Sequence, residues 1–187
     1  MHVDGTDPYP WPYDGRLVGR HLAVVLAGWD VGWASRCPTT GSALVSADAL
    51  ARATVEAGGT VLSVAHLGAS PLPLSAPRME VSAHGVDGFH GGPLDDLLRA
   101  GGHTHLLVAG MGLEGPVHST LRSANDRGYE CLLVLDASAP ITDDLAAAAA
   151  RTVTMSGGIF GAVGTSAATI AALTGAPRPT TPTGARP

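Results

Sequence analysis

Short apolar runs recur along the chain and alternate with segments whose apolar residues repeat at helical spacing. The apolar runs predict buried strands, at 21–27, 60–65, 105–109, 130–135 and 151–155. The amphipathic segments and their Gly and Pro boundaries predict helices, at 46–57, 93–100, 117–127, 143–150 and 165–173. Alternation of this kind favours an α/β fold of three layers (α-β-α), with a mostly parallel central sheet and helices on both faces.

The two ends of the chain differ from this pattern. Residues 1–15 contain two prolines between aromatic side chains, which excludes a helix or a central strand and indicates an extended arm laid over an apolar surface. Residues 174–187 are rich in Pro and Thr and are expected to be disordered. We therefore expect one domain over residues 1–173, its first 15 residues forming the arm.

The alternation also predicts where a ligand would bind. In open parallel sheets the crevice lies beyond the carboxyl ends of the strands. Those ends are expected at 27–30, 66–70, 110–115 and 136–140, with the loop 68–92 as a roof.

Composition narrows the functional classes. The chain has 187 residues, of which 45% are hydrophobic, and a formal net charge of -5, which argues against nucleic-acid binding and a basic membrane-surface protein. No apolar run approaches the ~18 residues of a spanning helix. Two cysteines do not make a disulfide framework, so we expect a cytoplasmic protein. All 11 basic residues are Arg, which excludes any mechanism that needs a lysine.

Four stretches together resemble one family. They are PYPWPYDG (8–15), GFHGGPLDDLLRAGGHTHLLVAG (88–110), VHSTLRSANDRGYECLLVLDASAP (117–140) and SGGIFGAVGTSAA (156–168). In order and spacing they resemble the isochorismatase-like cysteine hydrolases, near the branch that hydrolyses biuret-like and ureido amides. The resemblance implies an isochorismatase-like (Rossmann-like) fold, a homo-oligomer (dimer or tetramer), and hydrolysis by an Asp, a Lys and a Cys.

At the three positions that the resemblance assigns to this triad, the chain has Ala27, Ala83 and Pro116. Proline removes both the sulfur nucleophile and a backbone N–H that could hold an oxyanion. Family-type acyl transfer is therefore not expected. Since these residues are small or apolar, we expect a crevice that is larger and less polar than in the family.

Several polar and aromatic residues remain near the expected crevice. Candidate acid and base groups are Asp30, His66, His84 and His118. Asp30 could cap a loop or line the crevice, and His118, at a helix start, is expected to be neutral. Candidate substrate-binding residues are Trp29, Phe89, His90, Glu114 and Pro116. No tight ligand spacing occurs among the acid and base candidates, so we expect no metal.

Gly110–Gly115 matches the dinucleotide motif GxGxxG, with Asp136 about where a ribose-binding acid would stand. The match is weak in a glycine-rich chain, and Pro116 deletes an amide at the phosphate end. We expect no cofactor.

Three functional hypotheses follow. The first is non-covalent acid–base chemistry of lyase, isomerase or cyclase type on a small metabolite, as in specialised metabolism. The second is a non-catalytic protein that binds a metabolite or serves as the inert subunit of an active partner. The third is an amidase that uses Cys37, which lies in a loop expected to be exposed but has no evident base beside it. Cys131, inside a predicted strand, is expected to be inert core.

Overall fold

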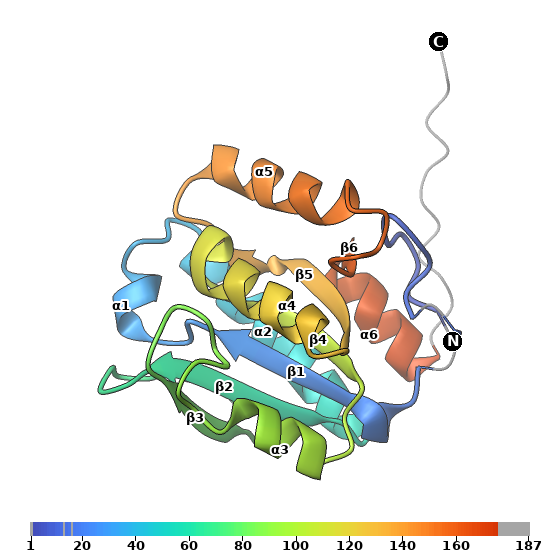
Figure 1. The fold of residues 1–187 in the computed structure, drawn as a ribbon, viewed down its shortest axis with the longest axis horizontal. Helices are drawn as coiled ribbons and strands as arrows, with labels where there is room; N and C mark the ends of the chain where they lie inside the picture. The colour runs from blue at the N-terminus through green and yellow to red at the C-terminus, as the bar shows by residue number, and fades with distance from the viewer. Residues whose placement is uncertain (1, 13, 16, 176–187) are drawn as a thin grey trace.

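The computed structural model describes residues 2–12, 14–15 and 17–175. Six parallel strands form one sheet in the order β3-β2-β1-β4-β5-β6 (Figure 1). Their bounds are β1 Leu22–Ala27, β2 Thr60–His66, β3 Met79–Ala83, β4 His105–Met111, β5 Glu130–Ala139 and β6 Ala162–Gly164. The helices are α1 Val31–Ala34, α2 Thr40–Glu56, α3 Leu94–Ala100, α4 His118–Asp126, α5 Asp143–Thr154 and α6 Ser166–Thr174.

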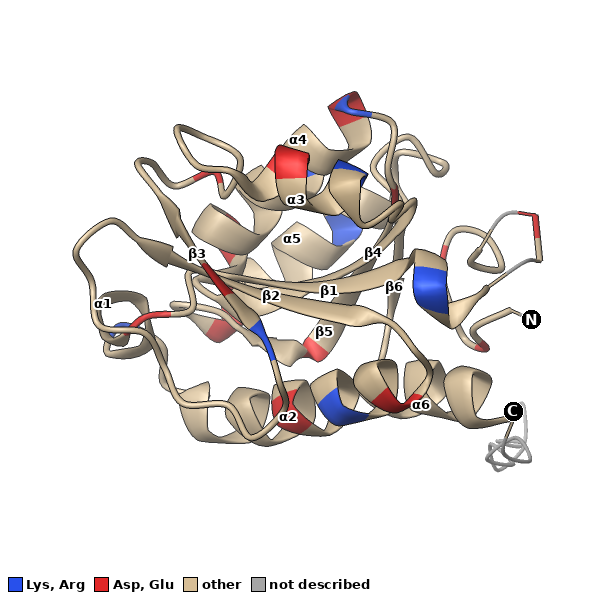
Figure 2. Cartoon of the chain, turned by 90° about the horizontal axis from the view of Figure 1, so that it is seen from below, with Lys and Arg blue, Asp and Glu red and all other residues tan. Residues whose placement is uncertain are grey.

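Helices cover both faces of the sheet. Figure 2 shows α2 and α6 on one face and α3, α4 and α5 on the other. All six residues of β1 are buried, and they alternate between the two faces. Val24 and Leu26 join the core under α2, whereas Ala23 and Val25 join the core under α3 and α4. This two-sided burial explains the continuous apolar run, and the predicted three-layer α/β fold is confirmed.

Two strands differ from the prediction. β3 was not predicted because it is an edge strand in which only Val81 and Ala83 are buried, so it carries no apolar run. The strand predicted at 151–155 is wrong: these residues continue α5 and its closing turn. The last strand is β6, only three residues long, beside β5.

Two helices also differ from the prediction. α2 begins at Thr40, six residues before the predicted start, and the short helix α1, which follows β1 closely, was not predicted. A π-helical turn, Leu113–Val117, joins β4 to α4 and contains Pro116. Proline fits here because a helix start leaves its missing N–H without consequence.

The N-terminal arm lies against the β6 edge of the sheet. Asp7 and Val163 exchange backbone hydrogen bonds of 3.1 and 2.8 Å in an antiparallel bridge. Trp11 is fully buried, with the edge of its ring against His105. The tail predicted from residue 174 lies, beyond Gly175, outside the described residues. In the described part of the chain, no helix is both long and apolar enough to cross a bilayer.

Candidate functional site

A small cavity lies at the carboxyl ends of β1, β2 and β3, where the alternating pattern predicts a crevice. Gly28, Ala83 and Pro116 line it from three different segments. Ala27, directly before Gly28, is fully buried. The positions that the resemblance assigns to the family triad therefore converge in space, although they are 89 residues apart at the extremes, from 27 to 116.

This cavity is nearly filled. Its volume is about 10 Å³, which is at most the room of one water molecule. A Cβ atom on Gly28, whose φ is +60°, would lie 3.0 Å from Pro116 Cβ and 2.6 Å from the carbonyl oxygen of Met111. Little free space therefore remains directly between Gly28 and Pro116.

Trp33 supplies much of the filling. Its indole lies so close to the turn after β4 that a Cβ on Gly112 would be 2.6 Å from Trp33 Cε3. A Cβ on Gly115 would be 3.3 Å from Trp33 Cη2. The turn thus needs glycine at position 112, both for this approach and for its φ of +67°.

A second, larger pocket adjoins this cavity and shares Trp33 with it. Its volume is about 340 Å³, at the small end of the range for ligand sites. Its lining comes from α1 and the residues beside it, the end of β2, and the loops after β2 and β3, namely Asp30, Gly32, Trp33, Arg36, His66, Ala69, Gly85 and Val86. Trp33, His66, Gly85 and Val86 line both spaces.

Asp30 both caps a helix and lines the larger pocket. Its Oδ1 accepts a hydrogen bond of 3.0 Å from the backbone N–H of Trp33, at the start of α1. Its Oδ2 accepts one of 3.1 Å from the backbone N–H of His66. The side chain is almost fully buried, so these bonds hold the carboxylate in a fixed position that ties β1 to β2.

Two exposed side chains stand at the mouth of the larger pocket. His66 ends β2 there, as predicted. Arg36 stacks on Trp33, with its guanidinium carbon 5.0 Å from the ring centre. Among the residues that the structure describes, Arg36 forms no ion pair.

The other three histidine candidates lie elsewhere. His84 and His90 are exposed on the loop after β3, where the N–H of His84 donates to the carbonyl of His90 at 2.9 Å, and neither lines the pocket. His118 begins α4, and burial together with Arg122 lowers its pKa. Its Nε2 is buried and has no hydrogen-bond partner among the described residues.

Three predicted substrate-binding residues are packing or capping residues instead. Trp29 is fully buried and its indole N–H donates to the carbonyl of Leu72 at 3.2 Å. Both carboxylate oxygens of Glu114 accept the backbone N–H of Ile141, at 2.9 and 3.2 Å. Phe89 is 7% exposed and stacks on Tyr129. None of them lines the larger pocket.

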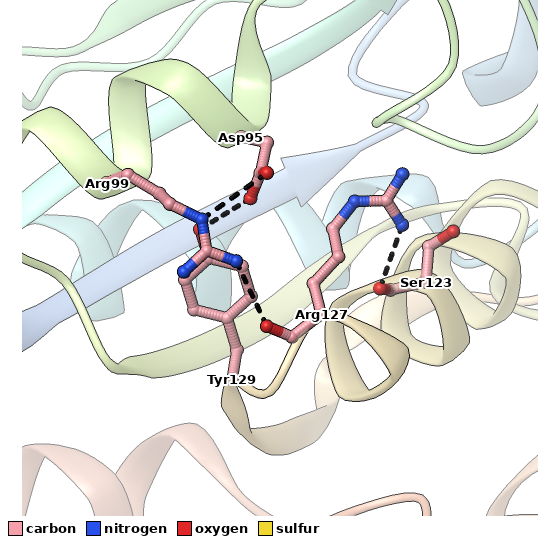
Figure 3. Close-up of polar contacts among 5 residues, drawn as sticks. All are labelled: Asp95, Arg99, Ser123, Arg127 and Tyr129. Atoms are coloured by element: carbon pink, nitrogen blue, oxygen red, sulfur yellow. Dashed lines mark hydrogen bonds and ion pairs between the residues drawn. The ribbon is translucent and has the colours of Figure 1, made fainter.

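The cluster beneath Phe89 joins α3, α4 and β5. Tyr129 Oη donates to Asp95 at 2.7 Å, and Arg99 donates to the carbonyl of Arg127 at 3.0 Å (Figure 3). Arg127 in turn donates to the carbonyl of Ser123 at 3.0 Å and lies over the ring of Phe89. These contacts explain why Phe89 points into the protein and not toward a ligand.

The loop after β3 is fastened to α4. Ser123 Oγ donates to Asp87 Oδ2 at 2.5 Å, and the backbone N–H of Gly88 donates to Thr120 Oγ1 at 2.9 Å. Asp87 Oδ1 also accepts the backbone N–H of Phe89 at 3.0 Å. The predicted roof, loop 68–92, is interrupted by the strand β3. The part after β3, which includes the pocket residues Gly85 and Val86, is held in place by its hydrogen bonds to α4.

Neither cysteine is an accessible nucleophile. Cys37 is 6% exposed, contrary to the expectation of an exposed loop thiol. Its Sγ accepts the N–H of Gly112 and donates to the carbonyl of Trp33, both at 3.3 Å, and burial raises its pKa. Cys131 is fully buried, as predicted, and burial raises its pKa strongly.

The residues of the dinucleotide motif have other roles. Asp136 accepts both the N–H and the hydroxyl of Ser166, at 2.7 and 2.5 Å, and so caps α6. Gly112 and Gly115 lie against Trp33. Across residues 2–12, 14–15 and 17–175, no three His, Cys, Asp or Glu side chains are placed to hold a metal ion.

Fold and site together define the class: an α/β protein of three layers with its pocket at the carboxyl edge of a parallel sheet. The sequence matches the isochorismatase domain over residues 27–168, so the chain belongs to the isochorismatase domain family.

Solved structures agree with this fold. A cysteine hydrolase from Pseudomonas syringae pv. phaseolicola 1448A superimposes with a TM-score of 0.75 at 19% identity, over 86% of this chain and 97% of the other. The nicotinamidase SaPncA from Staphylococcus aureus gives 0.69 at 15%, over 77% and 98%. The MAR1 ribonuclease from Caenorhabditis elegans gives 0.74 at 17%, over 86% and 84%. At these identities the likeness concerns the fold alone.

Sequence reasoning gave neither Arg36 nor Trp33 as a site residue. The available signal was the spacing Asp30, Trp33, Arg36 directly after the first strand. Residues three apart on a helical turn share a face, and here that face forms one wall of the pocket.

Proposed function

We propose that this protein is a non-hydrolytic member of the isochorismatase domain family that binds a small molecule in the pocket of about 340 Å³ beside Trp33. By resemblance, Ala27, Ala83 and Pro116 stand where cysteine hydrolases of the family have Asp, Lys and Cys. The observation that carries the proposal is the filled cavity between Pro116 and Trp33.

The filled cavity argues against acyl transfer in two ways. A cysteine hydrolase needs a thiolate, a base, and room for a tetrahedral carbon beside the nucleophile. A space of about 10 Å³ lined by Pro116 and Ala83 offers no such room and no ionisable side chain from those two positions. Cys37 does not substitute for the missing thiol, since it is buried and its pKa is raised.

Binding without reaction is supported by the scatter of the acid and base candidates. Of the four, His84 and His118 do not line the larger pocket. Asp30 is bound by two backbone N–H groups and so serves first as a structural tie. Such a protein would act alone or as the inert subunit of an active partner.

A second candidate function rests on one contact. Asp30 and His66 line the same pocket, and the carboxylate accepts the backbone N–H of His66. Together they could move a proton on a bound metabolite, in a lyase, isomerase or cyclase reaction without a covalent intermediate. Under this function, His66→Gln would abolish turnover and leave ligand affinity nearly unchanged.

The motifs in residues 88–140 support a place near the biuret- and ureido-amide branch, and the resemblance supports a homo-oligomer. The two cysteines, which make no disulfide framework, support a cytoplasmic location. Light scattering on the purified full chain would give the subunit number. A monomer at micromolar concentration would contradict the assembly.

Ammonia release from biuret, nicotinamide and benzamide tests the proposed function. We expect no release above the rate without protein, and no thioester adduct in the intact mass. A Cys37→Ser variant is the matched control, because it removes the thiol that a cysteine amidase mechanism would use, with little change in side-chain volume. Ammonia release that disappears in this variant would overturn the proposal and revive the thiol mechanism.

A further inference from the structure

The larger pocket combines an apolar wall with an arginine, Arg36, that forms no ion pair with any residue the structure describes. Trp33 and Val86 line it, and Val86 is 48% exposed although it is a large apolar residue. Arg36 is held at the same wall by stacking on Trp33. When a ligand covers an exposed apolar side chain, apolar surface is removed from water, and this favours binding.

The guanidinium of Arg36 is prepared for an anion. Stacking on an aromatic ring holds the group by its face and leaves its N–H edges available for hydrogen bonds. Among the described residues, no carboxylate pairs with it. Arginine binds carboxylates with two parallel N–H···O bonds, which are among the stronger hydrogen bonds in proteins.

The remaining charge in the pocket limits the ligand to one negative charge. The carboxylate of Asp30 is almost fully buried, and its two oxygens already accept backbone N–H groups. It would repel a second negative group placed in the pocket.

The apolar wall of the larger pocket limits the shape of the ligand. The indole of Trp33 offers a flat apolar surface, and planar rings prefer offset or edge contacts with such a surface. A pocket of about 340 Å³ suits a molecule of one or two rings.

We propose that this pocket binds a small planar monoanion of the aromatic carboxylate class, with its ring against Trp33 and Val86 and its carboxylate on Arg36. The inference rests on the proposed function, because it takes the larger pocket, and not the small cavity at Pro116, as the binding site. His66, at the same mouth, lies within the lining and contributes a second polar contact.

Calorimetric titration with benzoate and with benzamide tests the charge, because the two molecules have nearly the same shape and differ by one negative charge. Cyclohexanecarboxylate tests planarity. We expect benzoate to bind at least about tenfold more tightly than benzamide, and more tightly than cyclohexanecarboxylate. In Arg36→Gln the preference for benzoate over benzamide should disappear.

Arg52→Gln is the matched control, since Arg52 is an exposed arginine of α2 that pairs with Asp48 and does not line the pocket. It removes the same charge and should leave the preference unchanged. Unfolding midpoints of both variants show that they are folded.

The inference fails if neither aromatic probe binds, if both bind equally, or if the benzoate preference survives Arg36→Gln. Conversion of benzamide to benzoate and ammonia would instead overturn the proposed function. The two failures are therefore distinct.

Discussion

Trp33 decides the shape of the site at the scale of single residues. It contributes to the lining of both the small cavity beside Pro116 and the larger pocket. Its backbone N–H is fixed by Asp30 and its carbonyl accepts the thiol of Cys37. One aromatic side chain thus closes the position that the family resemblance assigns to the nucleophile and forms the wall of the neighbouring space.

The two thiols give a direct test of this arrangement. Because Cys37 and Cys131 are buried and burial raises the pKa of both, we expect neither to react with Ellman's reagent in the native protein at pH 8. Both should react in denaturant. Rapid reaction of either thiol in the native protein would contradict the burial of that cysteine.

Shortening the side chain of Trp33 should open the small cavity beside Pro116. In a Pro116→Cys background the new thiol should be protected from Ellman's reagent, and adding Trp33→Ala should speed its labelling about tenfold or more, because access limits the reaction of a covered thiol. The Trp33→Phe change keeps an aromatic ring and is the control. Since Trp33 is half-buried, we expect Trp33→Ala to cost about 1–3 kcal/mol of unfolding free energy, measured in urea. Equal labelling with and without Trp33 would show that its ring does not cover position 116.

At the scale of elements, the loop after β3 depends on α4 for its position. Asp87 and Gly88 bond to Ser123 and Thr120, and Phe89 is packed on Arg127. These residues come directly after Gly85 and Val86, which line the pocket. The loop that forms one side of the pocket is therefore placed by a helix that itself begins just after Pro116.

Weakening this attachment should affect both stability and binding. Asp87→Asn loses the charge that accepts from Ser123 and Phe89, and we expect a loss of about 1–2 kcal/mol in unfolding free energy. We also expect weaker benzoate binding, because Val86 loses its support. Asp126→Asn makes the same chemical change at an exposed position of α4 and should alter neither quantity by more than about 0.5 kcal/mol. An unchanged urea midpoint in Asp87→Asn would show that the loop does not need this contact.

The whole molecule buries several histidines, and this makes its stability depend on pH. Burial lowers the pKa of His103, His105 and His118, so the unfolded chain binds protons near its ordinary histidine pKa more readily than the folded protein does. The contribution of these histidines to the free energy of unfolding is therefore fully present above about pH 6.5 and is lost as the pH falls below that value. Urea unfolding at pH 7.5 and 5.5 should show this decrease, and His118→Gln should make it smaller. A protein equally stable at both values would contradict the burial of these side chains.

The hydrophobic pattern was sufficient for the interior elements. The interior strands are buried on both faces, so their residues form the apolar runs from which they were predicted. These strands are β1, β2, β4 and the first part of β5. The edge strands β3 and β6 were missed, because an edge strand is short or half-exposed and its pairing depends on a neighbour that sequence does not specify.

By itself, the sequence determined the three-layer α/β fold, the carboxyl edge as the place of the site, and the lack of any lysine in the chain. It also determined that Ala27, Ala83 and Pro116 offer no carboxylate, amine or thiol at the positions that the resemblance assigns to the triad. Only the tertiary structure decided which side chains face that space. It turned Trp29, Phe89 and Glu114 away from the pocket, placed Trp33 across the cavity, and set Arg36 at the mouth. The physical reason is that strand periodicity follows from local burial, whereas the lining of a pocket depends on how distant loops pack against one another.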